Sequence, residues 1–137
     1  MWWTYALLSA LFAALTAILA KIGIKGVDSN LATAVRTVVI LVLAWGIVFF
    51  RGGLAEVHTL SRTNLLFLGL SGLATGLSWI FYFKALQVGQ VSQVAPLDKL
   101  SVALAIVLSV VFLEEKLTLQ TGVGAGLIVI GTLVLIR

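Results

Sequence analysis

The chain has 137 residues, of which 61% are hydrophobic and 10% are charged, and its mean hydropathy is +1.19. A soluble domain carries about 25% charged residues, and a chain this small needs many polar residues to cover its surface. The composition therefore excludes a soluble globular domain and indicates a protein of the lipid bilayer. The absence of cysteine excludes disulfides, thiolate zinc sites and iron–sulfur clusters.

The charge balance is basic, with nine Lys and Arg residues against five Asp and Glu residues. In a soluble chain this excess would suggest a nucleic-acid partner. Most of these cations flank apolar runs, so membrane topology and anionic headgroups explain them better. We expect no nucleic-acid partner.

Three uncharged runs are long enough to cross a bilayer, which takes roughly 20 apolar residues in a helix. They are residues 1–20, 63–83 and 117–136, and each ends next to a Lys or Arg residue. The first run begins with aromatic residues, whose amphipathic rings favour the headgroup level. It lacks the cationic start of a secretory signal, so we expect it to remain as a span.

Two further runs, residues 37–50 and 100–113, are nominally too short to cross alone. Extending them toward the amino terminus brings Arg36 into the first, and Pro96, Asp98 and Lys99 into the second. The alternative is a pair of re-entrant hairpins. We predict an all-α integral membrane protein, one domain over residues 1–137, with five transmembrane helices. The predicted helices are residues 3–20, 31–50, 65–83, 92–113 and 119–136.

The cations of the loops give a weak topology signal. With five spans the amino-terminal face carries Arg51, Arg62 and Lys116, and the opposite face carries Lys21, Lys25, Lys84 and Arg137. The score is three cations against four, or three against six when Arg36 and Lys99 are added. Because positive charge sets orientation, a near-tie permits insertion both ways and hence an antiparallel homodimer. A single orientation with a weak signal is the other interpretation.

Polar and small residues form stripes on the predicted helices. Residues three and four apart share a helix face, and polar atoms in hydrocarbon should face protein or a cavity. The third span carries Ser71, Thr75, Ser78 and Tyr82 at these spacings, and the fourth carries Asp98, Ser101, Ala105 and Ser109. Two GxxxG pairs, Gly72–Gly76 and Gly122–Gly126, permit close helix approach. They favour packing within one subunit slightly over contact between subunits.

Two ionisable residues lie within predicted spans, where a charge marks a functional site by default. Arg36 is about 7–8 Å inside the second span and Asp98 about 9 Å inside the fourth. Both enter from the same face, so three interpretations stay open: work on substrate or coupling, a structural ion pair, or snorkelling of Arg36 to the interface.

Pro96 is the only proline of the chain. It removes one amide donor and frees the carbonyl of Ser92 beside Asp98. Transporters use such broken helices at binding sites, although an ordinary kink is an equal alternative.

His58, near Glu56 in a polar loop, is expected to be solvated. No metal site, cofactor site or phosphate-binding motif is apparent, so we expect no cofactor, no ATP-driven pump in this chain and no enzyme.

Residues 9–39 ("SALFAALTAILAKIGIKGVDSNLATAVRTVV") and 81–135 resemble the opening and the closing half of an EamA-type domain of the drug/metabolite transporter superfamily. In the closing half the family pattern combines an ALxxG turn, an A-P-L on the fourth helix, an L-x-E-x-L-T/S loop, then Q-x-x-G and a glycine-bearing last helix. These elements match Ala85, Leu86, Gly89, Ala95–Leu97, Glu115, Leu117, Thr118, Gln120 and Gly131. The last part is displaced, because Gly122 and Gly124 straddle the expected glycine.

Most members of this family have ten helices in two inverted domains, so the resemblance implies that two copies of this half-size chain associate antiparallel. The small multidrug exporters of the superfamily carry an embedded glutamate on the first helix. Residues 1–20 contain no acid, which weakens a cation/proton antiport.

Together these features predict a multi-pass secondary transporter of the cytoplasmic membrane that exports a small amino-acid-like or anionic metabolite by alternating access. Arg36 would hold a substrate carboxylate, and Asp98 would couple transport to protons, because a carboxyl group buried in a membrane can relay them. The alternatives are an exporter of lipophilic cations and a non-transporting assembly subunit. The predicted substrate-binding residues are Arg36, Ser71, Thr75, Ser78, Trp79, Tyr82, Ser101 and Ser109.

Overall fold

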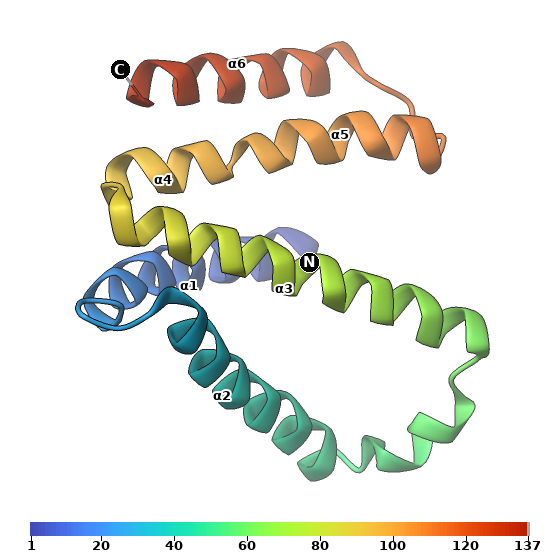
Figure 1. Cartoon of the computed structure of the whole chain (residues 1–137). Coiled ribbons are helices and arrows are strands. Elements are labelled where there is room, and N and C mark those ends of the chain that lie inside the picture. Colours follow the sequence, from blue (N-terminus) through green and yellow to red (C-terminus); the bar gives the residue numbers. More distant parts are fainter. Residues whose placement is uncertain (137) are drawn as a thin grey trace. The chain divides into compact units, whose positions relative to one another are not determined.

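A computed structural model describes residues 1–136 of the chain, and Arg137, one of the cations counted above, lies outside the described residues. The described chain is helical, without strands (Figure 1). Its helices are α1 (Trp2–Gly23), α2 (Ser29–Phe50), α3 (Arg62–Val88), α4 (Val91–Asp98), α5 (Leu100–Phe112) and α6 (Leu119–Ile136), with the 3-10 helix η1 (Gly53–Thr59) between α2 and α3.

Five segments are long and apolar enough to cross a bilayer, which confirms the predicted all-α fold with five transmembrane helices. They are α1, α2, α3, the pair α4–α5 (Val91–Phe112) and α6. Both runs that seemed too short belong to segments of 22 residues, about 33 Å at 1.5 Å per residue. Arg36 and Asp98 therefore lie inside spanning segments, as predicted.

The chain divides into two units, which we describe separately: residues 19–87, and residues 1–18 together with the chain from residue 88. In the first of these units α2 begins at Asp28, whose carboxylate accepts hydrogen bonds of 3.0 Å from the amides of Asn30 and Leu31. Such a cap satisfies amides that have no partner in the first helical turn. The sharp loop before it contains Gly26 at φ +77, a left-handed conformation that glycine adopts without strain.

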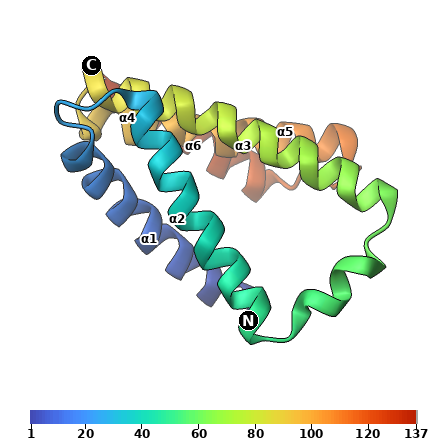
Figure 2. The ribbon, with the colours of Figure 1, turned by 60° about the horizontal axis from the view of Figure 1, so that its bottom comes forward.

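Helices α2 and α3 lie close together where α2 begins and α3 ends, and they diverge toward η1 (Figures 1 and 2). The buried residues of this unit gather at the close end: Ile24, Ser29, Thr33, Phe83 and Leu86. Two long side chains also join the segments there. The Lys21 ammonium donates to the carbonyl of Leu86, and the Gln87 amide donates to the carbonyl of Val27 at 2.9 Å. We call this end, residues 21–33 with 83–87, the closed end.

In the other unit α6 packs against both α4 and α5. Thr132 is the buried polar residue of α6. A Cβ added at Gly122, Gly124 or Gly126 would meet no other atom within 4 Å, and the same holds for Gly72 and Gly76 of α3 in the first unit. Within each unit, therefore, the glycine stripes do not mediate the close helix contacts that we expected to be the slightly better explanation.

Candidate functional site

The Arg36 side chain lies against aromatic rings of α3. Its guanidinium carbon is 4.1 Å from the centroid of the Trp79 ring and 5.1 Å from that of Phe83. Trp79 and Phe83 are four residues apart and so share one helix face. A cation over an aromatic face is attracted by the ring quadrupole, more strongly when water is excluded. This contact stabilises a charge that would otherwise be costly within a span.

Stacking on rings leaves the hydrogen-bonding capacity of Arg36 available. A guanidinium carries five N–H donors in its own plane, whereas the ring contacts use its faces. Among residues 1–136 the salt bridge is between Lys99 and Asp98, and no carboxylate pairs with Arg36. The arrangement presents a fixed, half-buried cation whose geometry matches a carboxylate.

Arg36 stands immediately beyond the closed end. Thr33, one turn earlier on α2, is buried, and its hydroxyl donates to the carbonyl of Ser29 at 2.8 Å. On α3, Phe83 is buried and Trp79 is partly exposed. The cation thus lies where packed side chains give way to exposed ones.

The predicted polar face of α3 continues from this point toward η1. Ser71, Thr75 and Ser78 are exposed and Tyr82 is half-buried, and the Thr75 hydroxyl donates to the carbonyl of Ser71 at 2.9 Å. From Leu54 to Thr75 every residue is exposed in the chain. Since hydroxyl groups in hydrocarbon need protein or water beside them, this face requires a cover.

Ser101 and Ser109 belong to the other unit, where Ser101 is exposed and the Ser109 hydroxyl donates to the carbonyl of Ile106 at 3.0 Å. Of the predicted substrate-binding residues, the structure brings Arg36 into contact with Trp79. A cavity shared between α3 and the fourth span stays a prediction.

Asp98 and Arg36 each interact with another residue of their own unit: Asp98 with Lys99, and Arg36 with Trp79. The Asp98 carboxylate lies 3.4 Å from the Lys99 ammonium, and both side chains are partly exposed. Lys99 separates α4 from α5 and is therefore at an interruption of the fourth span. An ion pair between Arg36 and Asp98 stays a prediction.

The interruption of the fourth span lies three residues beyond the expected position. Pro96 is inside α4, and the helix ends at Asp98. The backbone tightens after the proline: the Lys99 amide donates to the Pro96 carbonyl and the Val102 amide to the Lys99 carbonyl, both at 3.0 Å. These bonds span three residues instead of four, as in a 3-10 turn.

A hydroxyl from α6 supports this interruption. The side chain of Thr132 donates to the Pro96 carbonyl at 3.2 Å, and Thr132 itself is only 4% exposed. In membranes, neighbouring Ser and Thr side chains satisfy backbone groups near a helix break. Sequence reasoning did not predict this bond, although a hydroxyl residue in the strongly apolar second half of α6 is a signal for it.

His58 and Glu56 are exposed on η1, as their polar surroundings predict. Within the described residues no three His, Cys, Asp or Glu side chains gather as they would to hold a metal ion. The groups described above that could recognise a ligand are the half-buried guanidinium of Arg36, the aromatic rings beside it and the hydroxyl groups of α3.

The family of the chain follows from comparison with known proteins. The sequence profile of the EamA-like transporter family matches residues 1–137. The chain belongs to this family. This confirms the resemblance seen in the sequence and supports a membrane transporter.

A relative from Sinorhizobium sp., described as an uncharacterized transporter in the cobO 3' region, is 48% identical over 134 residues. The match covers 98% of this chain and 95% of the relative, so this EamA-like protein and its relative have nearly the same length. No solved structure matches the chain significantly.

Proposed function

We propose that the protein exports a small amino-acid-like or anionic metabolite across the cytoplasmic membrane by alternating access. Membership of the EamA-like family supports secondary transport. The observation that carries the substrate class is the position of Arg36, whose charge is stacked on Trp79 and has no acidic partner among residues 1–136. A substrate carboxylate would complete this site through paired N–H donors.

The proposed binding region extends from Arg36 along the polar face of α3. Trp79 and Tyr82 would supply apolar walls and one hydroxyl, and Ser71, Thr75 and Ser78 would supply further hydrogen bonds. Ser101 and Ser109 of the fourth span would offer further hydroxyls to the substrate. Asp98, paired with Lys99 at the helix interruption, would take up and release the coupling proton.

We further propose that two copies associate antiparallel to complete the transporter. The exposed polar face of α3 and the glycines without close neighbours in their own units support this assembly, because both need a protein surface beside them. Single cysteines at Arg51 and Lys25, introduced into this cysteine-free chain, would each be labelled from both sides of the membrane. Strictly one-sided labelling at both positions would contradict the antiparallel pair.

The substrate class is tested by thermal denaturation of detergent-solubilised protein with amino acids, organic anions and lipophilic cations. A ligand that binds only the folded state raises the melting temperature, by an increment that grows with its concentration. We expect stabilisation by a carboxylate-bearing compound, and loss of that shift in Arg36→Gln. Lys25→Gln, which removes an exposed loop cation, is the matched control and should keep the ligand-induced shift in melting temperature. Stabilisation of the parent and of Arg36→Gln alike by lipophilic cations would overturn the proposal in favour of multidrug export.

A further inference from the structure

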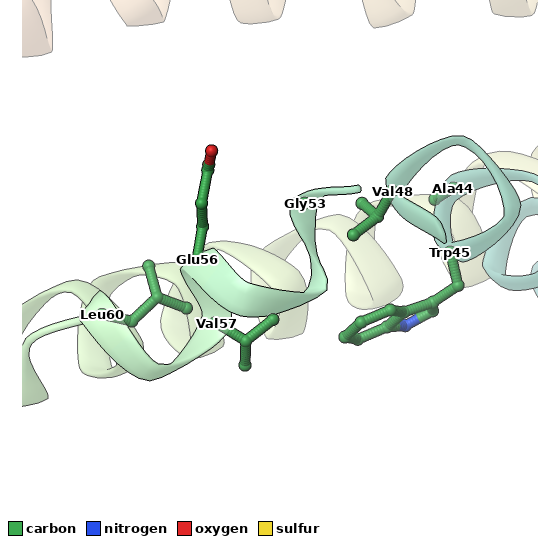
Figure 3. A pocket seen from close by; sticks show the side chains of 7 residues that line it. All are labelled: Ala44, Trp45, Val48, Gly53, Glu56, Val57 and Leu60. Carbon is green, nitrogen blue, oxygen red and sulfur yellow. The ribbon is translucent and has the colours of Figure 1, made fainter. Parts of the chain in front are cut away.

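A hollow of about 240 Å³ lies between the end of α2 and η1, away from the Arg36 site (Figure 3). Its walls are mostly apolar side chains that the transport proposal does not use. The apolar lining residues are Ala44, Trp45, Val48, Gly53, Val57 and Leu60, and Glu56 also lines the hollow.

The 3-10 helix that forms one wall is amphipathic. At 3.0 residues per turn, residues three apart eclipse one another, so Leu54, Val57 and Leu60 form a single apolar stripe. These three side chains are 45%, 39% and 37% exposed. Glu56, His58 and Thr59 occupy the remaining faces. A short segment with one apolar stripe and polar flanks is suited to the boundary between headgroups and acyl chains.

Trp45 indicates that the hollow lies at the boundary between headgroups and acyl chains. It is five residues from Phe50, the last residue of the spanning helix α2, which is about 8 Å along the helix axis. Its ring is half exposed, and tryptophan favours the membrane–water interface. The hollow thus opens where the glycerol backbone and first methylenes of a phospholipid lie.

The charges beside the hollow are mainly positive. Arg51 follows α2 and Arg62 begins α3, so each stands two residues from a lining residue, and both are exposed. Glu56 is the one acid between them. Glu56 is itself a lining residue, and Figure 3 shows its side chain extending from η1 on the side opposite to the Val57 side chain. Two exposed cations this near in sequence to the wall of a mostly apolar hollow would complement a phosphate joined to an acyl chain.

We propose that this hollow is a binding site for one anionic phospholipid. Part of an acyl chain would fill the space beside Trp45 and Val57, and Arg51 and Arg62 would hold the phosphate. A zwitterionic lipid would offer the same chain, but its headgroup cation would gain nothing from two arginines. The charge at the rim therefore predicts selection by headgroup rather than general contact with lipid.

Trp45 provides a direct measurement of this site. We would keep Trp45 as the single tryptophan by replacing Trp2, Trp3 and Trp79 with Phe, and reconstitute the protein into vesicles. Phosphatidylglycerol or phosphatidylcholine with brominated acyl chains would then be compared as quenchers at equal mole fractions. Surface cations favour anionic lipid by about fivefold each, so phosphatidylglycerol should show an apparent affinity roughly five- to thirtyfold higher. If the triple variant does not fold, the difference in quenching between the parent and Trp45→Phe gives the quenching of Trp45 by each lipid.

Two matched variants separate the site from general membrane charge. Arg51→Gln with Arg62→Gln should make the two lipids quench equally, whereas Lys25→Gln with Lys84→Gln removes the same charge elsewhere and should keep the preference. Ala44→Leu should fill the hollow and weaken quenching by both lipids. Equal quenching by the two lipids in the parent, or a preference that survives loss of both arginines, would overturn the proposal. Absence of quenching by either lipid would also overturn it, because protein would then cover the hollow.

Discussion

The two ends of the α2–α3 pair contrast in how the helices are held. At the closed end, Leu86 is fully buried, Phe83 is 2% exposed, and side chains of Lys21 and Gln87 donate to backbone carbonyls across the segments. At the other end α2 and α3 diverge (Figure 2), and every residue from Leu54 to Thr75 is exposed. One end is thus joined by buried side chains and hydrogen bonds, whereas no residue from Leu54 to Thr75 is buried in this unit to hold the helices at one separation. Arg36 and Trp79 lie between the two.

The largest expected effect is the difference in stability between substitutions at the two ends. Leu86→Ala should lower the free energy of unfolding by about 2–5 kcal/mol, the range for a fully buried leucine. Leu73→Ala, at a residue that is 62% exposed, should change it by less than about 0.5 kcal/mol. Reversible unfolding in mixed detergent micelles measures both. An equal loss for the two variants would mean that the diverging end is packed as tightly as the closed one.

A smaller effect tests the contact between the two ends. In a double-mutant cycle, Arg36→Met and Trp79→Leu should show a coupling energy of about 0.5–2 kcal/mol, because the guanidinium lies over the indole. The control cycle of Arg62→Met with Trp79→Leu should be additive to within about 0.5 kcal/mol. The same unfolding assay supplies all values, and additivity of the Arg36 cycle would show that the stacking contributes nothing.

The smallest expected effect concerns the hydrogen bond from Thr132 to the fourth span. We expect this single bond to stabilise that span less than side-chain packing stabilises the closed end. Thr132→Val removes the hydroxyl bonded to the Pro96 carbonyl without changing the side-chain shape, and should cost about 0.6–1.7 kcal/mol, as for other interhelical bonds in membranes. Thr132→Ser should retain most of the stability. A loss of stability in Thr132→Ser with none in Thr132→Val would contradict this and assign the effect to the methyl group and its packing.

The fold was predictable because its signals are local. The apolar runs locate the five spans, although α2 begins at Ser29, two residues before the predicted start, because Asp28 caps the helix there. The helix α3 extends beyond its uncharged run at both ends, from Arg62 to Val88. Charged residues bound the hydrocarbon core but do not end a helix that continues into the headgroup region.

The site was predictable only in part. A cation inside a span identifies Arg36, because burial without a partner is costly. Its partner could not be predicted, since the contact with Trp79 depends on the register and crossing of two helices that are distant in sequence. The bond from Thr132 to Pro96 joins residues 36 apart, and depends on α6 packing against α4. The position of the interruption, at Lys99 rather than Pro96, depends on the same packing.

If transport proceeds by the proposed alternating access, α2 and α3 should stay joined at the closed end and change their separation at the other. Distances between paired spin labels test it directly, and the cysteine-free chain gives no background labelling. For labels at Lys25 and Lys84, within the closed end, we predict a narrow distance distribution that the stabilising carboxylate ligand does not change. For labels at Phe49 and Leu65 we predict a broader distribution whose mean shifts when that ligand is added. A ligand-induced shift at Lys25–Lys84 with a constant distance at Phe49–Leu65 would contradict the account.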